Sequence, residues 1–117
     1  MQHYLHYGLG FASHLLTRDE YERLDDRRDE MGRGQVGFSI VPYTEEGERG
    51  WSTVVLMDLG EIGDSGKMIT AKEVRAAVET LERLQLEHEQ ALRNELSKHG
   101  LEHLVQQIEP VFFSDNY

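Results

Sequence analysis

The residues best suited to bind a transition metal are the six histidines of the chain. Their spacing is poor for that purpose. His88 and His99 would share one face of a helix, but the residues between them set them about 16 Å apart at 1.5 Å per residue. His99 and His103 have i,i+4 spacing, but Gly100 falls between them and is typical of a helix end. The histidines therefore predict no metal site.

Three acids could supply oxygen ligands to calcium, which prefers several carboxylate and carbonyl oxygens. They are Asp58, Glu61 and Asp64. Their spacing matches no calcium-loop pattern, whereas acids in a glycine-rich segment are common in a solvated turn. We interpret this segment as a turn and expect neither a metal nor another cofactor.

The tetrapeptide Gly63-Asp64-Ser65-Gly66 resembles the residues around the nucleophile of chymotrypsin-like serine proteases. The family continues with glycine where this chain has Lys67, and it needs a much longer double barrel with an upstream histidine motif. A catalytic triad is a geometric arrangement that four residues do not define. The phosphate-loop pattern fails as well, because Met68 follows Lys67 where serine or threonine is required. We therefore expect no catalysis by Ser65, and a protein that is not an enzyme.

Length and composition describe a single folded domain. The chain has 117 residues, of which 38% are hydrophobic and 29% are charged, which predicts one domain over residues 1–117. The absence of cysteine excludes disulfides, thiolate metal sites and a cysteine nucleophile. The formal net charge of −10 argues against direct binding to nucleic acid or anionic lipid, because like charges repel.

No segment of the sequence predicts export or membrane insertion. The longest uncharged apolar stretch near the start, Tyr4 to Leu16, has no basic region before it, unlike a secretory signal. No stretch approaches the roughly 20 apolar residues that span a bilayer. We therefore expect a cytoplasmic protein with no membrane partner.

The first strand and the first helix are predicted by alternation and by a cap. Apolar residues occupy every second position at the start of the chain, as in a half-buried strand, at Leu5, Tyr7, Leu9 and Phe11. Gly8 and Gly10 on the opposite face predict a bend or a closely packed neighbour. Thr17 and Glu20 have the spacing of a capping box, so a helix should begin at Thr17 and continue to about Met31.

Two more strands and a long helix complete the pattern. The strands are expected over Gly37 to Tyr43 and Trp51 to Leu59, joined by a polar segment with two glycines that is typical of a hairpin loop. A second capping box at Thr70 and Glu73 predicts a helix from Ala71 to about Lys98. A short helix and an apolar tail follow, over Leu101 to Ile108 and Val111 to Phe113.

These elements predict an α+β fold. A small antiparallel sheet of β-α-β-β-α order packs against one long helix, followed by a short C-terminal helix and a tail. The helix would be about 42 Å long and a strand only about 23 Å, so roughly half of the helix must extend beyond the sheet. The apolar residues there need cover: Leu92, Leu96 and Leu101. We expect self-association as a homodimer; the alternative is that Leu101 to Ile108 folds back over them.

The negative charge is concentrated between Thr44 and Gly66, which holds six acids and one base, Arg49. The acids are Glu45, Glu46, Glu48, Asp58, Glu61 and Asp64. Such a cluster can steer a protein to a basic surface, or it can serve only solubility and protection of a sheet edge. The two acidic connections border different strand ends, which leaves open whether the acids form one patch or two.

The leading hypothesis is an acidic protein-binding module whose acids engage a basic protein surface, such as that of a nucleic-acid-binding complex. In kind, such a domain is similar to phage-encoded inhibitors of host defence complexes, anti-CRISPR proteins included. The likeness is one of type and rests on no residue motif. The alternative is a structural or assembly protein that self-associates through its long helix and its apolar C-terminal tail.

Overall fold

The structure is a computed structural model that describes residues 3–25, 32, 34–42, 52–62 and 68–116. It contains β1 (His3–Ala12), η1 (Ser13–Leu15), α1 (Arg18–Asp25), β2 (Ser39–Pro42), β3 (Ser52–Glu61), α2 (Ala71–Glu87), α3 (Glu89–Lys98), η2 (Glu102–Gln107) and β4 (Glu109–Asn116). The α+β class and the predicted element order are confirmed. The expected continuation of the first helix to Met31 lies outside the described residues.

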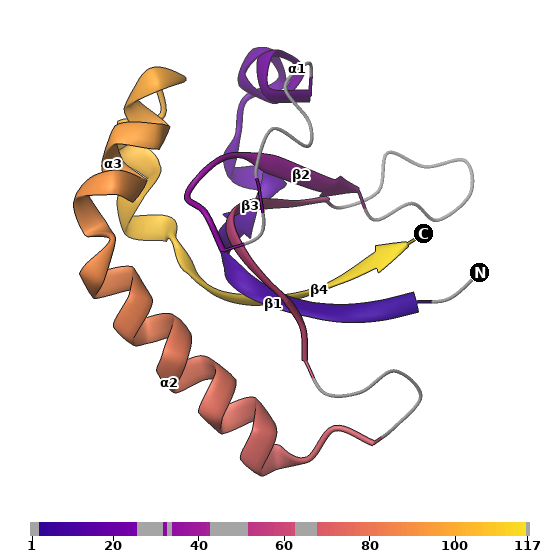
Figure 1. The fold of residues 1–117 in the computed structure, drawn as a ribbon. Coiled ribbons are helices and arrows are strands. Elements are labelled where there is room, and N and C mark those ends of the chain that lie inside the picture. Colours follow the sequence, from indigo (N-terminus) through magenta and orange to yellow (C-terminus); the bar gives the residue numbers. More distant parts are fainter. Residues whose placement is uncertain (1–2, 26–31, 33, 43–51, 63–67, 117) are drawn as a thin grey trace.

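The sheet has four strands in the order β2-β3-β1-β4, and every neighbouring pair is antiparallel. The apolar tail of the sequence is its fourth strand. It pairs with most of β1, from His3 opposite Asn116 to Gly10 opposite Glu109. The first and last described residues therefore lie close together, at the same end of the neighbouring strands β1 and β4 (Figure 1).

Strand β1 is irregular where glycines replace larger residues. Its register against β3 shifts between His6 and Gly8 and again between Leu9 and Gly10. A Cβ atom added at Gly8 or Gly10 would overlap the backbone of β3. The glycines thus permit a close approach of the two central strands, as the sequence pattern had indicated.

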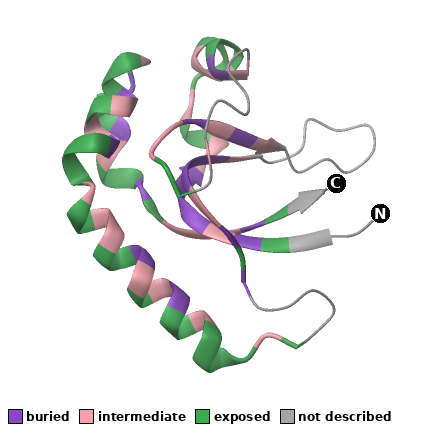
Figure 2. Ribbon diagram, in the orientation of Figure 1, coloured by how far each residue is buried: buried purple, intermediate pink, exposed green. Residues whose placement is uncertain are grey.

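The core lies between the sheet and the helices. Leu9 and Phe11 of β1 are buried in one cluster with Leu81 of α2 and Leu92 of α3. The alternation predicted for β1 therefore places its apolar face against the helical layer, although Leu5 at the far end of this face is 38% exposed. Figure 2 shows the buried positions of α2 turned towards the sheet and the exposed ones turned outwards.

The prediction of one continuous helix from Ala71 to Lys98 is wrong. The helical segment bends at His88, which has φ −107° and ψ 17° and separates α2 from α3. Backbone hydrogen bonds continue on both sides, from His88 N–H to the Leu84 carbonyl and from Leu92 N–H to the His88 carbonyl, each at 2.9 Å. The bend lets α2 follow the sheet while α3 turns towards a different partner (Figure 1).

That partner is η2, which the chain brings back over α3 through a glycine turn. Gly100 has φ +71°, a left-handed conformation that glycine adopts without a Cβ penalty. Leu101 N–H donates to the Leu96 carbonyl at 2.9 Å and Gly100 N–H donates to the Ser97 carbonyl at 3.1 Å. This Schellman arrangement ends α3 and reverses the chain, so that η2 packs against the helix it follows.

Both predicted capping boxes are present. Glu20 N–H donates to the Thr17 hydroxyl at 3.3 Å and Thr17 N–H donates to the Glu20 carboxylate at 2.8 Å. At α2, Glu73 N–H donates to the Thr70 hydroxyl, and the Glu73 carboxylate accepts from Thr70 N–H. The caps satisfy backbone donors that the first turn of each helix leaves free.

Gly10→Ala tests the close approach of β1 to β3. We expect a loss of about 1–3 kcal/mol or more in the free energy of unfolding, the usual cost of adding volume to packed structure, as measured by urea denaturation. Gly32→Ala is the control, because the atoms nearest to its added Cβ belong to the flexible Gln35 side chain. A Gly10→Ala protein as stable as the parent would contradict the described pairing.

Glu20 gives the fold a defined pH dependence. Its hydrogen bond from the Thr17 backbone N–H, helped by the Thr17 hydroxyl, His103 and Arg23, holds the pKa of this carboxyl below its ordinary value despite partial desolvation. A pKa lowered in the folded state stabilises the protein above the unfolded-state pKa, about 4.3, and the stabilisation is lost as pH falls through the folded-state pKa.

Glu20→Gln should therefore destabilise the protein at pH 7, and the difference should shrink as pH falls from about 5 to about 3. Urea denaturation of both proteins across this pH range measures the difference. A constant difference in the free energy of unfolding over the whole range would contradict the assigned pKa direction.

Candidate functional site

Most of the acids predicted to bind a partner fall where the structure gives no description. Glu45, Glu46, Glu48 and Asp64 lie outside the described residues, as does the tetrapeptide that contains Ser65. Of the six acids, Asp58 and Glu61 are described, and both lie near the end of β3. Their surroundings differ sharply.

Asp58 is engaged inside the protein. Both of its carboxylate oxygens lie 3.2 Å from His6 Nδ1, and Oδ1 accepts the Gly60 N–H at 2.7 Å. The imidazole is buried and its ring lies 5.6 Å from that of Phe113. Asp58 therefore links β3 to β1 and holds the backbone at Gly60, a residue of β3 with φ +92° beside a register shift between the two strands. We place it among the structural residues rather than among the exposed acids.

Glu61 is exposed at the last position of β3. The hairpin segment that carries Glu45, Glu46 and Glu48 joins the sheet at the other end of this strand, where Pro42 pairs with Ser52. A straight strand of this length would separate Ser52 from Glu61 by about 30 Å. The two acidic segments therefore border opposite ends of β3.

The leucines predicted to form a homodimer contact are internal. Leu92, Leu96 and Leu101 are at most 1% exposed within a single chain, because α3 and η2 pack against each other and against the core. Fold-back of the segment after α3, the alternative to self-association, provides the cover. These three side chains are therefore not available to a second copy in this fold.

Leu96→Ala should destabilise the monomer rather than dissociate an oligomer. We expect a loss of about 2–5 kcal/mol, typical of truncating a buried leucine. Leu86→Ala is the matched control: Leu86 is 76% exposed on the same helical segment, so its change should stay within about 0.5 kcal/mol. Urea denaturation gives both values. A Leu96→Ala protein of unchanged stability and altered sedimentation would instead support the dimer.

The histidines occupy separate surroundings. His99 is nearly buried, 3.5 Å from Glu95 and with its ring 5.3 Å from that of Phe38. His103 is exposed and lies 3.9 Å from Glu20. Across the described residues, no group of three or more His, Asp or Glu side chains is arranged to hold a metal ion.

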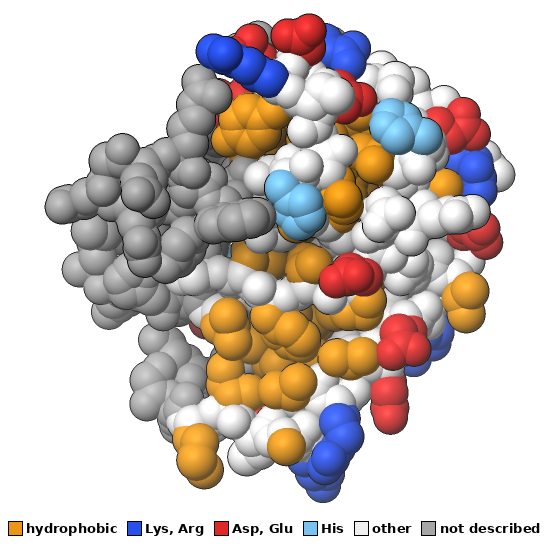
Figure 3. Space-filling view, turned by 180° about the vertical axis from the view of Figure 1, so that it is seen from behind, with side chains coloured by type: hydrophobic (Ala, Val, Ile, Leu, Met, Phe, Trp, Pro, Cys, Tyr) orange, Lys and Arg blue, Asp and Glu red, His pale blue; other side chains and the backbone are white. Residues whose placement is uncertain are grey.

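Large apolar side chains that are more than a third exposed are found at four described positions, Leu5, Leu15, Met68 and Leu86. Figure 3 shows hydrophobic side chains gathered on the back of the molecule, with charged side chains along its flank. Of the four, Leu86 lines a cavity. We therefore take its surroundings as the candidate site.

This cavity, the helix-bend groove, lies between the α2–α3 junction and the returning chain of η2, with a volume of about 420 Å³. Its apolar lining comes from both sides: Leu86 and Leu92 from the helices, Val105 and Ile108 from the returning chain. Glu82 and Glu89 line it from the helical side. The groove thus combines an apolar floor with an acidic border.

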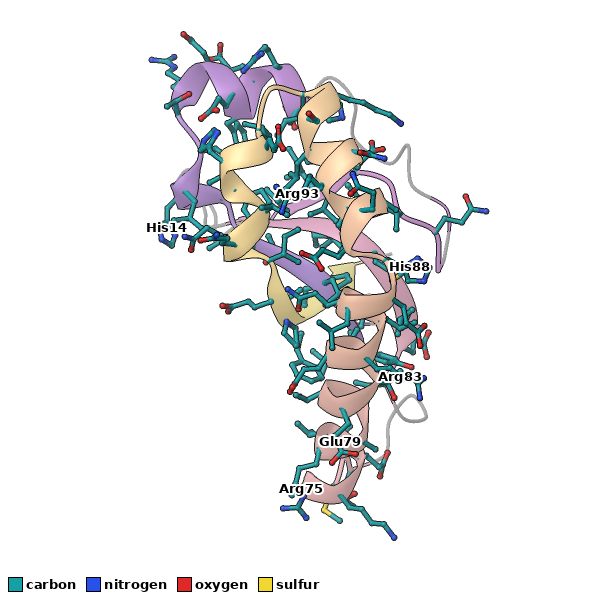
Figure 4. The ribbon with its side chains drawn as sticks, turned by 90° about the vertical axis from the view of Figure 1, so that its left-hand side faces the viewer. His14, Arg75, Glu79, Arg83, His88 and Arg93 are labelled. Atoms are coloured by element: carbon teal, nitrogen blue, oxygen red, sulfur yellow. The ribbon has the colours of Figure 1, made fainter. Side chains whose placement is uncertain are left out.

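Two other polar side chains of the groove, Gln85 and Arg93, are already engaged. Gln85 Nε2 donates to the Ile108 carbonyl at 2.8 Å, and Arg93 lies 3.4 Å from Glu102. Figure 4 shows Arg93 directed from α3 towards η2, whereas His88 and Arg83 lie on the opposite side of the helices. The signal that could have indicated this site is the position of Leu86, off the face of α2 that buries Ala77 and Leu81. The facing wall depends on the chain reversal at Gly100.

Comparison with protein-family models, curated proteins and solved structures finds no match for this chain. Within the part of the chain that the structure describes, the helices are too short or too polar to cross a membrane. The function must therefore be argued from the surface itself.

Proposed function

We propose that the protein is an acidic binding module that engages a basic surface of a macromolecular partner and acts by occupying it rather than by chemistry. A protein whose basic surface serves nucleic acid, such as a host defence complex blocked by a phage-encoded inhibitor, is the partner class that this charge fits best. The observation that carries the proposal is an imbalance of charge among the exposed side chains.

Several bases are neutralised locally. Surface ion pairs join Arg18 to Glu22, Arg83 to Glu87, Arg93 to Glu102 and Lys98 to Glu95, at distances of 3.1 to 3.8 Å. By contrast, six exposed glutamates have no ion pair with any described residue: Glu61, Glu73, Glu79, Glu82, Glu89 and Glu109. With the formal net charge of −10, this leaves a negative surface that attracts a basic partner over a distance.

Neutralising the two acidic segments separately tests this function and locates it. One variant is Glu45→Gln/Glu46→Gln/Glu48→Gln and the other is Glu61→Gln/Asp64→Asn. Asp58 is left intact because it holds His6 and Gly60. We expect at least one variant to slow association with the purified partner, captured from host extract at low salt, by about three- to tenfold.

Salt dependence and a matched variant provide the controls. The association rate of the parent should fall as NaCl is raised, because the Debye length shortens to about 8 Å near physiological ionic strength. Glu22→Gln/Glu87→Gln changes the net charge as much as the second variant and should have little effect. An association rate that changes neither with salt nor in the two neutralised variants would refute the acidic-surface function.

A further inference from the structure

The helix-bend groove has features of a docking site for a polypeptide segment. Its volume of about 420 Å³ is in the range of pockets that bury whole ligands or several side chains. Leu86, which lines it, is 76% exposed, so the groove is open to solvent on this side. An open apolar groove suits a chain laid along the helices better than an enclosed small molecule.

The charges of the groove specify the chemistry of that segment. Glu82 and Glu89 stand two helical turns apart, about 10 Å along the helices, with Leu86 between them. Both are exposed and neither has an ion pair with a described residue. Gln85 and Arg93 already interact with other residues of the same chain. The two glutamates are therefore the charged groups of the groove that a bound segment can pair with.

We propose that the helix-bend groove binds an amphipathic segment of a partner protein, which places an apolar side chain against Leu86, Val105 and Ile108 and basic side chains against Glu82 and Glu89. The proposal rests on the proposed function, because it assigns a contact site to the basic partner. A second copy of the chain is a poorer occupant, since its own charge of −10 would be repelled. The binding mode is that of a helix laid in an apolar groove.

A synthetic amphipathic peptide of leucine and lysine is the probe. It should bind the parent protein in calorimetry at physiological salt, with amide NMR shifts concentrated at Leu86, Val105 and Ile108. A peptide of the same charge with serine in place of leucine should bind at least about tenfold more weakly, because the apolar contact is missing. Equal binding of the two peptides would overturn the groove as the site.

Two variants of equal charge separate the groove from the general acidity of the protein. Glu82→Lys/Glu89→Lys should weaken the leucine-lysine peptide at least about tenfold, through loss of attraction and added repulsion. Glu22→Lys/Glu87→Lys alters two exposed acids that do not line the groove and should change the affinity less than about threefold. Leu86→Ser, at an exposed position, tests the apolar anchor without risk to folding.

The outcomes distinguish this inference from the function on which it rests. Equal losses in the two lysine variants, with NMR shifts away from the groove, would overturn the groove while leaving an acidic binding surface in place. Failure of every lysine-containing peptide to bind, together with a salt-insensitive natural partner, would overturn both. Sedimentation in which the parent is a dimer and Leu86→Ser a monomer would assign the groove to a second copy instead.

Discussion

The fold depends on covering the apolar side chains of a helical segment that is longer than the sheet beside it. Leu81 meets the sheet, but Leu92 and Leu96 lie more than two turns farther along. Leaving such leucines in water forgoes about 1.5–3 kcal/mol each, a large share of the net stability of a domain. The bend at His88 and the reversal at Gly100 bring η2 over them, so one chain completes its own core.

The same solution creates the helix-bend groove. The helices and the chain that returns beside them are in contact along only part of their length, and a channel remains next to that contact. The hydrogen bond from the Gln85 side chain to the Ile108 carbonyl, at 2.8 Å, holds the two walls of the channel at a fixed distance. The floor is apolar because it borders the core. The glutamates stand at its border because the outer face of the helices is charged. The candidate site is thus a consequence of the way in which η2 covers the part of the helical segment that extends beyond the sheet.

The features that the sequence predicted depend on residues close together in the chain, whereas those that it missed depend on residues far apart in the chain. The capping boxes at Thr17 and Thr70, the alternation of β1 and the element order depend on neighbours within a few residues, and all were predictable. The bend at His88 was not, because helix-forming residues flank it and packing of distant segments decides it. The contact of Asp58 was missed for the same reason: its partner His6 is 52 residues away, and the sequence does not distinguish an acid that faces solvent from one that faces an imidazole.

Charge and shape would divide the work of binding in the proposed function. Unpaired acids act over about a Debye length and raise the encounter rate with any basic surface, which by itself gives little choice of partner. Selectivity needs contacts that a wrong partner leaves unfilled. The apolar floor at Val105 and Ile108 and the flanking glutamates, Glu82 and Glu89, supply such contacts. A purely basic partner would leave the apolar floor exposed to water, and a purely apolar partner would leave the two glutamates without an ion pair. A segment must carry both features to gain from both.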